Sequence, residues 1–255
     1  MPKYTNKIWT TDEDAYLKEN YGNCDIDDLI LIMSRTKDSI LSRASILNVK
    51  KKTRKTNRVF ELNDRYFSLI DSKAKAYWYG FLWADGSLYN NSFELSLQAR
   101  DLYIIEKFKS DIGSTHKIFK HKKYNINRFL FSSKRFSEDL NKLNICNRKS
   151  YSDYIPIISD DYFLNFLLGL FDGDGHFSKS FVITCSPQVA NWLQLNIMRL
   201  FEIESKIYSV KNSHVKRFTI NKKKDISMLA SLLYKVNTFF LERKRIKFVE
   251  AGLLS

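Results

Sequence analysis

The sequence predicts an α+β protein in which two similar halves follow a small all-helical domain. The first observation is a repeat: residues 76–86 (AYWYGFLWADG) resemble residues 165–175 (NFLLGLFDGDG), and 89 positions separate Asp85 from Asp174. The second is that alternating apolar and polar residues, typical of half-buried strands, follow both copies. The third is a helical spacing of apolar residues within the first 49 positions. An offset this long indicates a duplicated domain rather than a solenoid.

Three short helices are predicted between residues 9 and 49. The first begins after Thr11, the second spans 25–33, and the third follows Thr36, because threonine side chains cap helix N-termini. The outer face of the third helix is polar and basic, as in a helix-turn-helix domain that lies in the major groove of DNA. The candidate DNA contacts on it are Lys37, Ser42 and Arg43. A plain three-helix domain with a solvated face is the alternative.

A basic run follows this helical domain. Residues 50–58 contain six lysines and arginines and no acid. Such a run is a solvated linker by default, but between two DNA-binding units it can follow a phosphate backbone, with Lys51 and Arg54 as candidate contacts. The predicted boundaries are therefore a helix-turn-helix-like domain at 1–49, a linker at 50–59, and two half-domains at 60–153 and 154–255.

Each half-domain is predicted to have the order α-β-β-α-β-β-α. Alternating apolar and polar residues predict strands at 92–98 and 181–185. Two further strands are predicted in each half, at 117–122 and 128–132 in the first and at 206–210 and 217–221 in the second. The helices that follow are 102–112, 136–143, 188–201 and 226–234. Antiparallel sheets with helices on one face leave the other face free to meet a ligand.

The polar face of these sheets is a candidate surface for reading base edges in the major groove, although an ordinary hydrated sheet face is the alternative. The candidate residues on the strands are Glu94, Ser96, Arg100, Arg128, Thr184, Arg217, Thr219 and Asn221. Nearby lysines favour contact with DNA over the alternative: Lys117, Lys120, Lys206 and Lys211.

The charge of the chain also indicates a polyanionic partner. The 42 lysines and arginines exceed the 28 acids and give a net charge of +14, as expected for a protein that binds nucleic acid. Three well-separated cysteines are interpreted as isolated thiols in a reducing compartment. Without a signal peptide or an apolar run of about 18 residues, we expect an intracellular protein with no membrane partner.

The two motif helices carry the candidate chemistry. Each is apolar nearly all round, contains a glycine that allows close approach of another helix (Gly80 and Gly169), and ends in an acid. A helix dipole disfavours negative charge at the C-terminal end. If the helices pack together, the carboxylates of Asp85 and Asp174 come side by side, which divalent cations would make tolerable.

These segments resemble the LAGLIDADG homing endonucleases in their single-chain form, from about residue 60 to the C-terminus. The second motif is close to the family pattern, whereas the first departs from it at Trp78, Tyr79 and Trp83 but keeps both glycines and the second acid. The resemblance implies two saddle-shaped sheets and a domain interface made by the paired helices. It also implies a monomer with two active sites, each cutting one strand of double-stranded DNA in intron homing.

The resemblance further implies the site residues. Asp85 and Asp174, with Ala84 and Gly173 before them, would hold Mg²⁺, for which Mn²⁺ can substitute, and no small-molecule cofactor is expected. A lysine near each scissile phosphate matches Lys134 in the first half. In the second half Lys223 matches best, although Lys222 or Lys224 could serve. Gln98 matches a polar residue of the water network, and its counterpart Ser186 matches more weakly.

The predicted function is therefore a site-specific, metal-dependent DNA endonuclease of the cytoplasm or nucleoid. An RNA maturase fits the charge equally well, and a DNA-binding regulator with an inactive nuclease core fits the N-terminal domain. Loss of Asp85 or Asp174 would favour these two alternatives, and the sequence retains both acids.

Overall fold

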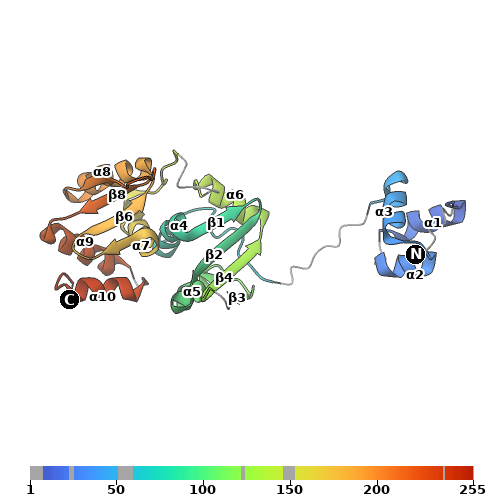
Figure 1. The fold of residues 1–255 in the computed structure, drawn as a ribbon, viewed down its shortest axis with the longest axis horizontal. Coiled ribbons are helices and arrows are strands. Elements are labelled where there is room, and N and C mark those ends of the chain that lie inside the picture. Colours follow the sequence, from blue (N-terminus) through green and yellow to red (C-terminus); the bar gives the residue numbers. More distant parts are fainter. Residues whose placement is uncertain are drawn as a thin grey trace. The chain divides into compact units, whose positions relative to one another are not determined.

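The structure, a computed structural model, describes residues 8–22, 26–50, 60–121, 124–145, 153–237 and 239–254. The chain forms two compact units, residues 1–59 (unit 1) and 60–255 (unit 2), each with its own core (Figure 1). Lys51 and Arg54 of the predicted linker lie outside the described residues, as do Cys24 and Cys146.

Unit 1 is a three-helix domain. Its helices are α1 (Thr11–Asn20), α2 (Ile26–Met33) and α3 (Lys37–Ile46), and their core contains Leu17, Tyr21, Leu29, Met33, Ile40 and Ala44. Thr36 caps α3 as predicted. The cap of α1 is Thr10 rather than Thr11, because Glu13 stands three residues after Thr10 and completes a capping box with it.

Unit 2 has the predicted α+β class and repeats one order of elements. The first half contains α4 (Lys73–Asp85), β1 (Gly86–Tyr89), β2 (Ser92–Gln98), η1 (Ala99–Asp101), α5 (Leu102–Asp111), β3 (Ile118–His121), β4 (Ile126–Ser132) and α6 (Lys134–Lys142). The second contains η3 (Asp160–Tyr162), α7 (Phe163–Asp174), β5 (Gly175–Phe177), β6 (Phe181–Cys185), α8 (Pro187–Phe201), β7 (Lys206–Ser209), β8 (Lys216–Ile220) and α9 (Lys223–Val236). A further helix, α10 (Glu242–Glu250), was not predicted from the sequence.

Each half contains a four-stranded antiparallel sheet, with strand orders β1-β2-β4-β3 and β5-β6-β8-β7. The registers are also equivalent. Gly86 pairs with Leu95 as Gly175 pairs with Ile183, and Ser96 pairs with Arg128 as Thr184 pairs with Arg217. Residues at these matching positions therefore have the same place in the two halves.

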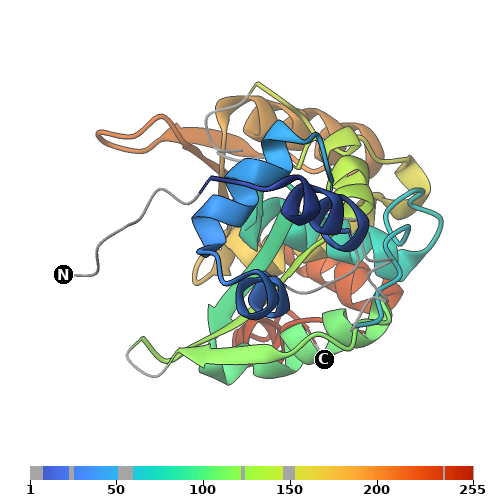
Figure 2. The same cartoon turned by 90° about the vertical axis from the view of Figure 1, so that its right-hand side faces the viewer.

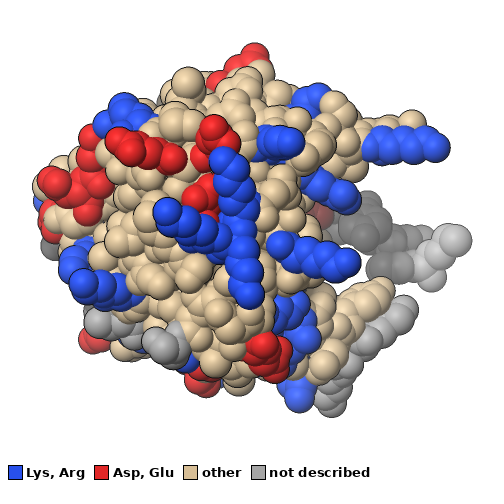
Figure 3. All heavy atoms as spheres, turned by 90° about the vertical axis from the view of Figure 1, so that its left-hand side faces the viewer, with Lys and Arg blue, Asp and Glu red and all other residues tan. Residues whose placement is uncertain are grey.

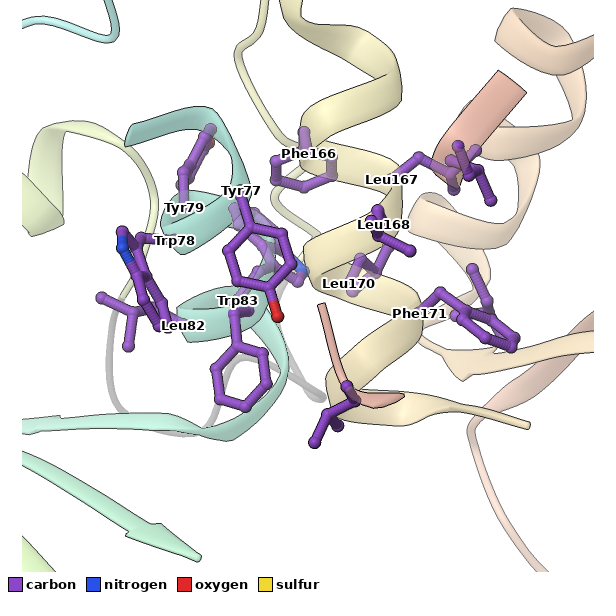
Figure 4. Close-up of a cluster of buried hydrophobic side chains, with 14 of the residues drawn as sticks. Tyr77, Trp78, Tyr79, Leu82, Trp83, Phe166, Leu167, Leu168, Leu170 and Phe171 are labelled. Carbon is purple, nitrogen blue, oxygen red and sulfur yellow. The ribbon is translucent and has the colours of Figure 1, made fainter. Parts of the chain in front are cut away.

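The helices α4 and α7 lie side by side in the centre of unit 2, and one continuous core runs through both halves (Figures 1 and 4). Their glycines explain how closely they approach. A Cβ atom on Gly80 would lie 1.9 Å from the carbonyl oxygen of Phe166, and one on Gly169 would lie 2.0 Å from that of Tyr77. The two backbones therefore touch at reciprocal positions where no side chain fits.

Two hairpins extend beyond this core. In Figure 2 the β3–β4 hairpin (green) and the β7–β8 hairpin (orange) project toward the same side of unit 2. The turns of the two hairpins therefore lie on one side of unit 2. Among the described residues, no helix is long and apolar enough to cross a bilayer.

Candidate active site and nucleic-acid interface

The acidic ends of α4 and α7 adjoin each other. A Cβ atom on Gly173 would lie 2.2 Å from the Cβ atom of Ala84 and 3.3 Å from Oδ2 of Asp85. Asp174 follows Gly173 directly, and both Asp85 and Asp174 are exposed. The structure thus brings the four residues predicted as metal ligands to one place on the surface.

The positions after the two acids need glycine because no side chain fits there, and not because of their backbone angles. Gly86 has φ −72° and Gly175 has φ −86°, which other residues also adopt. A Cβ atom, however, would lie 2.6 Å from the carbonyl oxygen of Leu82 at Gly86, and 2.6 Å from that of Phe171 at Gly175. The chain turns tightly from helix into strand at both positions, so each acid lies at the start of its sheet.

A buried lysine, Lys244 of α10, lies under the acidic end of α7. Its ammonium group donates to the carbonyl oxygens of Phe171 (2.6 Å), Gly173 (3.2 Å) and Gly175 (2.6 Å), and the residue is 7% exposed. Burial lowers the pKa of Lys244 to about 8, while nearby negative charges, including those of Asp85 and Asp174, oppose the shift. Sequence analysis missed this residue because it lies in a charged segment without motif spacing.

The two halves differ at one motif position. Asp172 is buried and accepts hydrogen bonds from the hydroxyl of Tyr77 (2.8 Å) and the amide of Leu241 (2.8 Å). Burial raises the pKa of Asp172 to about 6. Figure 4 shows Tyr77 lying between the two helices. The position 89 residues earlier holds Trp83, so only the second half carries a buried carboxyl group there.

The acidic centre has the donor chemistry that a hard divalent cation prefers. It offers two exposed carboxylates, whereas the carbonyl oxygens of Phe171, Gly173 and Gly175 at the end of α7 already accept from the ammonium group of Lys244. No group of three or more His, Cys, Asp or Glu residues in the described part of the chain is placed to hold a metal. Mg²⁺ uses one or two carboxylates and keeps several waters, so Asp85 and Asp174 fit it without a larger cluster.

The outer face of the first sheet, turned away from α5 and α6, carries a hydrogen-bonded group. Arg128 donates from Nε (2.9 Å) and Nη2 (2.7 Å) to the two carboxylate oxygens of Glu94, and the Ser96 hydroxyl donates to Glu94 Oε1 (2.6 Å). This ion pair holds the pKa of Glu94 below its usual range. Lys120 pairs with Asn127 on the opposite, core-side face, although its side chain is exposed.

The outer face of the second sheet carries Thr184, Arg217, Thr219 and Lys206, which are neighbours across three strands. Arg217 and Lys206 are exposed, whereas Thr219 is covered by its neighbours and is 6% exposed. The remaining candidates lie outside the strands at exposed positions: Arg100, Lys117, Lys211 and Asn221.

Comparison with known proteins gives a family match for one segment and a fold match for unit 2. Residues 161–233 match the sequence model of the LAGLIDADG-like domain. This chain contains a LAGLIDADG-like domain. Unit 2 also has the fold of solved LAGLIDADG homing endonucleases.

Three similar structures with TM-scores of 0.50 or above illustrate this likeness. I-LtrWI bound to target DNA gives a TM-score of 0.50 at 14% identity and covers 71% of this chain and 90% of that chain. I-SmaMI bound to cleaved DNA gives 0.51 at 13% identity, with coverages of 69% and 87%. I-SmaMI bound to an uncleaved target with calcium ions gives 0.51 at 14% identity, with coverages of 69% and 91%. No curated protein sequence matches the chain.

The lysines predicted from the resemblance follow the fourth strand of each half, at the ends of the strands away from the acids. Lys134 follows the end of β4 that pairs with Ser92, at the far end of β1 from Asp85. These ends are separated by about 10 Å along the strands, at roughly 3.3 Å per residue. Lys223 has the matching place at the start of α9, and both lysines are exposed.

The other members of this predicted set are spread over the same half-domains. Lys222 forms an ion pair with Glu204 (2.5 Å). Gln98 is exposed at the last position of β2, and Ser186 is buried as the N-cap of α8. Lys244 lies beside Asp174, because it binds the carbonyl groups of the residues before and after it, Gly173 and Gly175.

Unit 1 uses one of its predicted DNA contacts for its own fold. Arg43 donates to both carboxylate oxygens of Asp14 (2.7 and 2.5 Å), and its guanidinium lies 5.7 Å from the ring centroid of Trp9. Lys37 and Ser42 are exposed on α3. Residues 1–50 contain seven lysines and arginines and eight acids, so the excess positive charge lies in residues 51–255, with 35 basic and 20 acidic residues.

Charges are unevenly distributed on the surface of the second half of unit 2. Figure 3 shows lysine and arginine side chains gathered in the centre and on the right of this end of the molecule, and acidic ones toward the upper left. A polyanion approaching this end therefore meets a basic area beside an acidic one.

Proposed function

We propose that the protein is a site-specific, metal-dependent endonuclease of double-stranded DNA with two active centres, each cutting one strand. The observation that carries this proposal is the adjoining position of Asp85 and Asp174 at the ends of two helices in backbone contact. The fold supports it, because similar structures are homing endonucleases bound to target DNA or to cleaved DNA.

In this proposal the acids bind Mg²⁺, or Mn²⁺ in its place, together with the backbone at Ala84 and Gly173. The bound cation would supply an activated water and stabilise negative charge on the phosphate oxygens. Asp85 and Asp174 would each contribute a carboxylate to hold the metal. Lys244 fixes the carbonyl groups at the end of α7 and adds positive charge beneath the acids.

The remaining residues position the DNA. The outer faces of the two sheets would lie along the major groove, and the excess positive charge of residues 51–255 would neutralise phosphates. One chain supplies both centres, so a monomer is sufficient to cut both strands. Intron homing in the cytoplasm or nucleoid is the proposed biological setting.

Asp85→Asn and Asp174→Asn test the assignment. We expect each substitution to abolish double-strand cleavage and to leave specific duplex binding intact, because asparagine keeps the size of aspartate but not the charge that binds Mg²⁺. Asp161→Asn, at an exposed position in η3, is the matched control and should cut normally. The measurement is plasmid cleavage with Mg²⁺ after a target has been selected from randomised duplexes.

The products distinguish the possible outcomes. Nicking of one defined strand by each single variant would support two separable centres. Double-strand cutting at the wild-type rate by either variant would refute the assignment. Tighter binding to structured RNA than to any duplex would favour an RNA maturase instead.

A further inference from the structure

On the outer face of the first sheet, Glu94 and Ser96 hold the side chain of Arg128 in one orientation. The guanidinium of Arg128 has five N–H donors. Two of them, on Nε and Nη2, are held by the two oxygens of Glu94, and Glu94 is itself held by the hydroxyl of Ser96. The Arg128 side chain is 43% exposed, and in the described residues it makes no other ion pair.

The edge of the guanidinium that remains is the one formed by Nη1 and the second proton of Nη2. These two parallel N–H groups match the two acceptors that guanine presents in the major groove, O6 and N7. The other three bases present no such pair of acceptors there. An arginine held by its Nε edge therefore has guanine as its complementary base.

We propose that Arg128 reads a guanine in the target duplex and that Glu94 is a positioning residue that does not itself contact a base. The proposal rests on the proposed function, because it requires the outer face of the first sheet to enter the major groove. It changes the expectation drawn from the sequence, in which Glu94 was itself a candidate base contact.

Glu94 contributes by fixing the arginine before DNA arrives. A free arginine side chain has many rotamers, and holding it in one of them on binding costs free energy that lowers affinity. In the unbound protein, two charge-assisted hydrogen bonds to Glu94 already hold the arginine in one rotamer, so less conformational entropy is lost when DNA binds. Both oxygens of Glu94 are occupied by Arg128, and one of them also accepts from Ser96, so the carboxylate is poorly placed to accept from cytosine.

The second half provides an internal control. Arg217 has the same place as Arg128, because it pairs with Thr184 as Arg128 pairs with Ser96. The position that matches Glu94 holds Val182, and no ion pair with Arg217 occurs among the described residues. Arg217 therefore occupies an equivalent site without a carboxylate to hold it.

This comparison sets two expectations for the target sequence. The reciprocal contacts of α4 and α7 relate the two halves, so Arg128 and Arg217 should meet base pairs at equal distances from the centre of the site, on opposite strands. At the Arg128 position, guanine should be preferred by about 5- to 140-fold, the range of a good bidentate contact. At the mirrored position the preference should be weaker.

The test is selection from a randomised duplex library by the full-length protein in Ca²⁺, with bound duplexes sequenced and no cleavage required. Arg128→Met should remove the guanine preference at one position and leave the others unchanged. Glu94→Gln keeps the side-chain size but loses the charge, and should reduce the preference at that same position by several-fold. Arg217→Met, the matched control, should act only at the mirrored position. Thermal unfolding of each variant confirms that it is folded.

Three results would overturn the inference. If Glu94→Gln changes a position that Arg128→Met leaves alone, Glu94 reads a base itself. If both variants keep every preference of the wild type, the ion pair only bridges two strands. If the wild-type protein selects no duplex sequence, the proposed function fails, and this inference fails with it.

Discussion

Replacing Gly80 by alanine tests the close approach of α4 and α7. The new Cβ atom would lie 1.9 Å from the carbonyl oxygen of Phe166 and 2.8 Å from the amide nitrogen of Leu170. Ordinary contact begins near 3.4 Å, so the first pair falls short by about 1.5 Å. Both opposing atoms belong to the backbone and cannot rotate away, so the helices must separate.

The expected cost follows from two opposing effects. Overpacking a core typically costs about 1–3 kcal/mol, and a backbone clash belongs at the top of that range. Alanine recovers about 1 kcal/mol through its better helix propensity. The free energy of unfolding should therefore fall by about 2 kcal/mol, which corresponds to a melting temperature roughly 4–8 °C lower for a domain of this size.

A double-substitution cycle makes the test specific. Gly169→Ala introduces the reciprocal clash, 2.0 Å from the carbonyl oxygen of Tyr77, and the same separation of the helices relieves both. The double variant should therefore lose less stability than the two single variants together. Gly113→Ala is the control: it meets open space and bears only the cost of its φ of +57°. Urea unfolding followed by circular dichroism measures all four variants, and a Gly80→Ala protein as stable as the wild type would refute the close contact.

Three further predictions concern the buried groups and the charge. Tyr77→Phe removes one of the two donors to the buried Asp172, so the free energy of unfolding should fall by about 1–3 kcal/mol; unchanged stability in urea would contradict this. Burial raises the pKa of Cys185 to about 12, so its thiol should stay neutral well above pH 8. Iodoacetamide should therefore label Cys185 only in denaturant, and equal labelling of the native protein, measured by mass spectrometry, would contradict this prediction. With about ten phosphates neutralised, the log–log slope of duplex affinity against salt should be roughly −9, whereas a slope near −2 would show that the charge is not engaged.

The elements with a strong local pattern could be predicted from the sequence. The strands 92–98 and 181–185 were predicted with their observed bounds, because alternation on a half-buried strand fixes both ends. The helices α4 and α7 were predicted because each is a nearly continuous apolar segment and the two segments repeat each other. The start of α1 was misplaced by one residue, since Thr10 and Thr11 are both good caps and the position of Glu13 decides between them.

The parts that could not be predicted depend on contacts between distant residues. Lys244 lies in α10 among charged neighbours, and its partners are carbonyl groups 69 to 73 residues earlier in the chain. Glu94 and Arg128 are 34 residues apart and meet only because of the register of β2 and β4. Arg43 is bound by Asp14 from another helix, 29 residues earlier in the chain, and its basic character alone does not reveal this partner.

The reciprocal glycine contacts between α4 and α7 have the form of an isologous interface, the kind that joins two identical subunits about a two-fold axis. In such a dimer every residue occurs twice, so a change in one half is imposed on the other. A single chain removes that constraint: Trp83 stands where the second half has Asp172, and Val182 stands where the first half has Glu94. If the protein binds DNA as proposed, the covalent link between the halves removes the need for a palindromic target sequence, because the outer face of each sheet can acquire its own specificity.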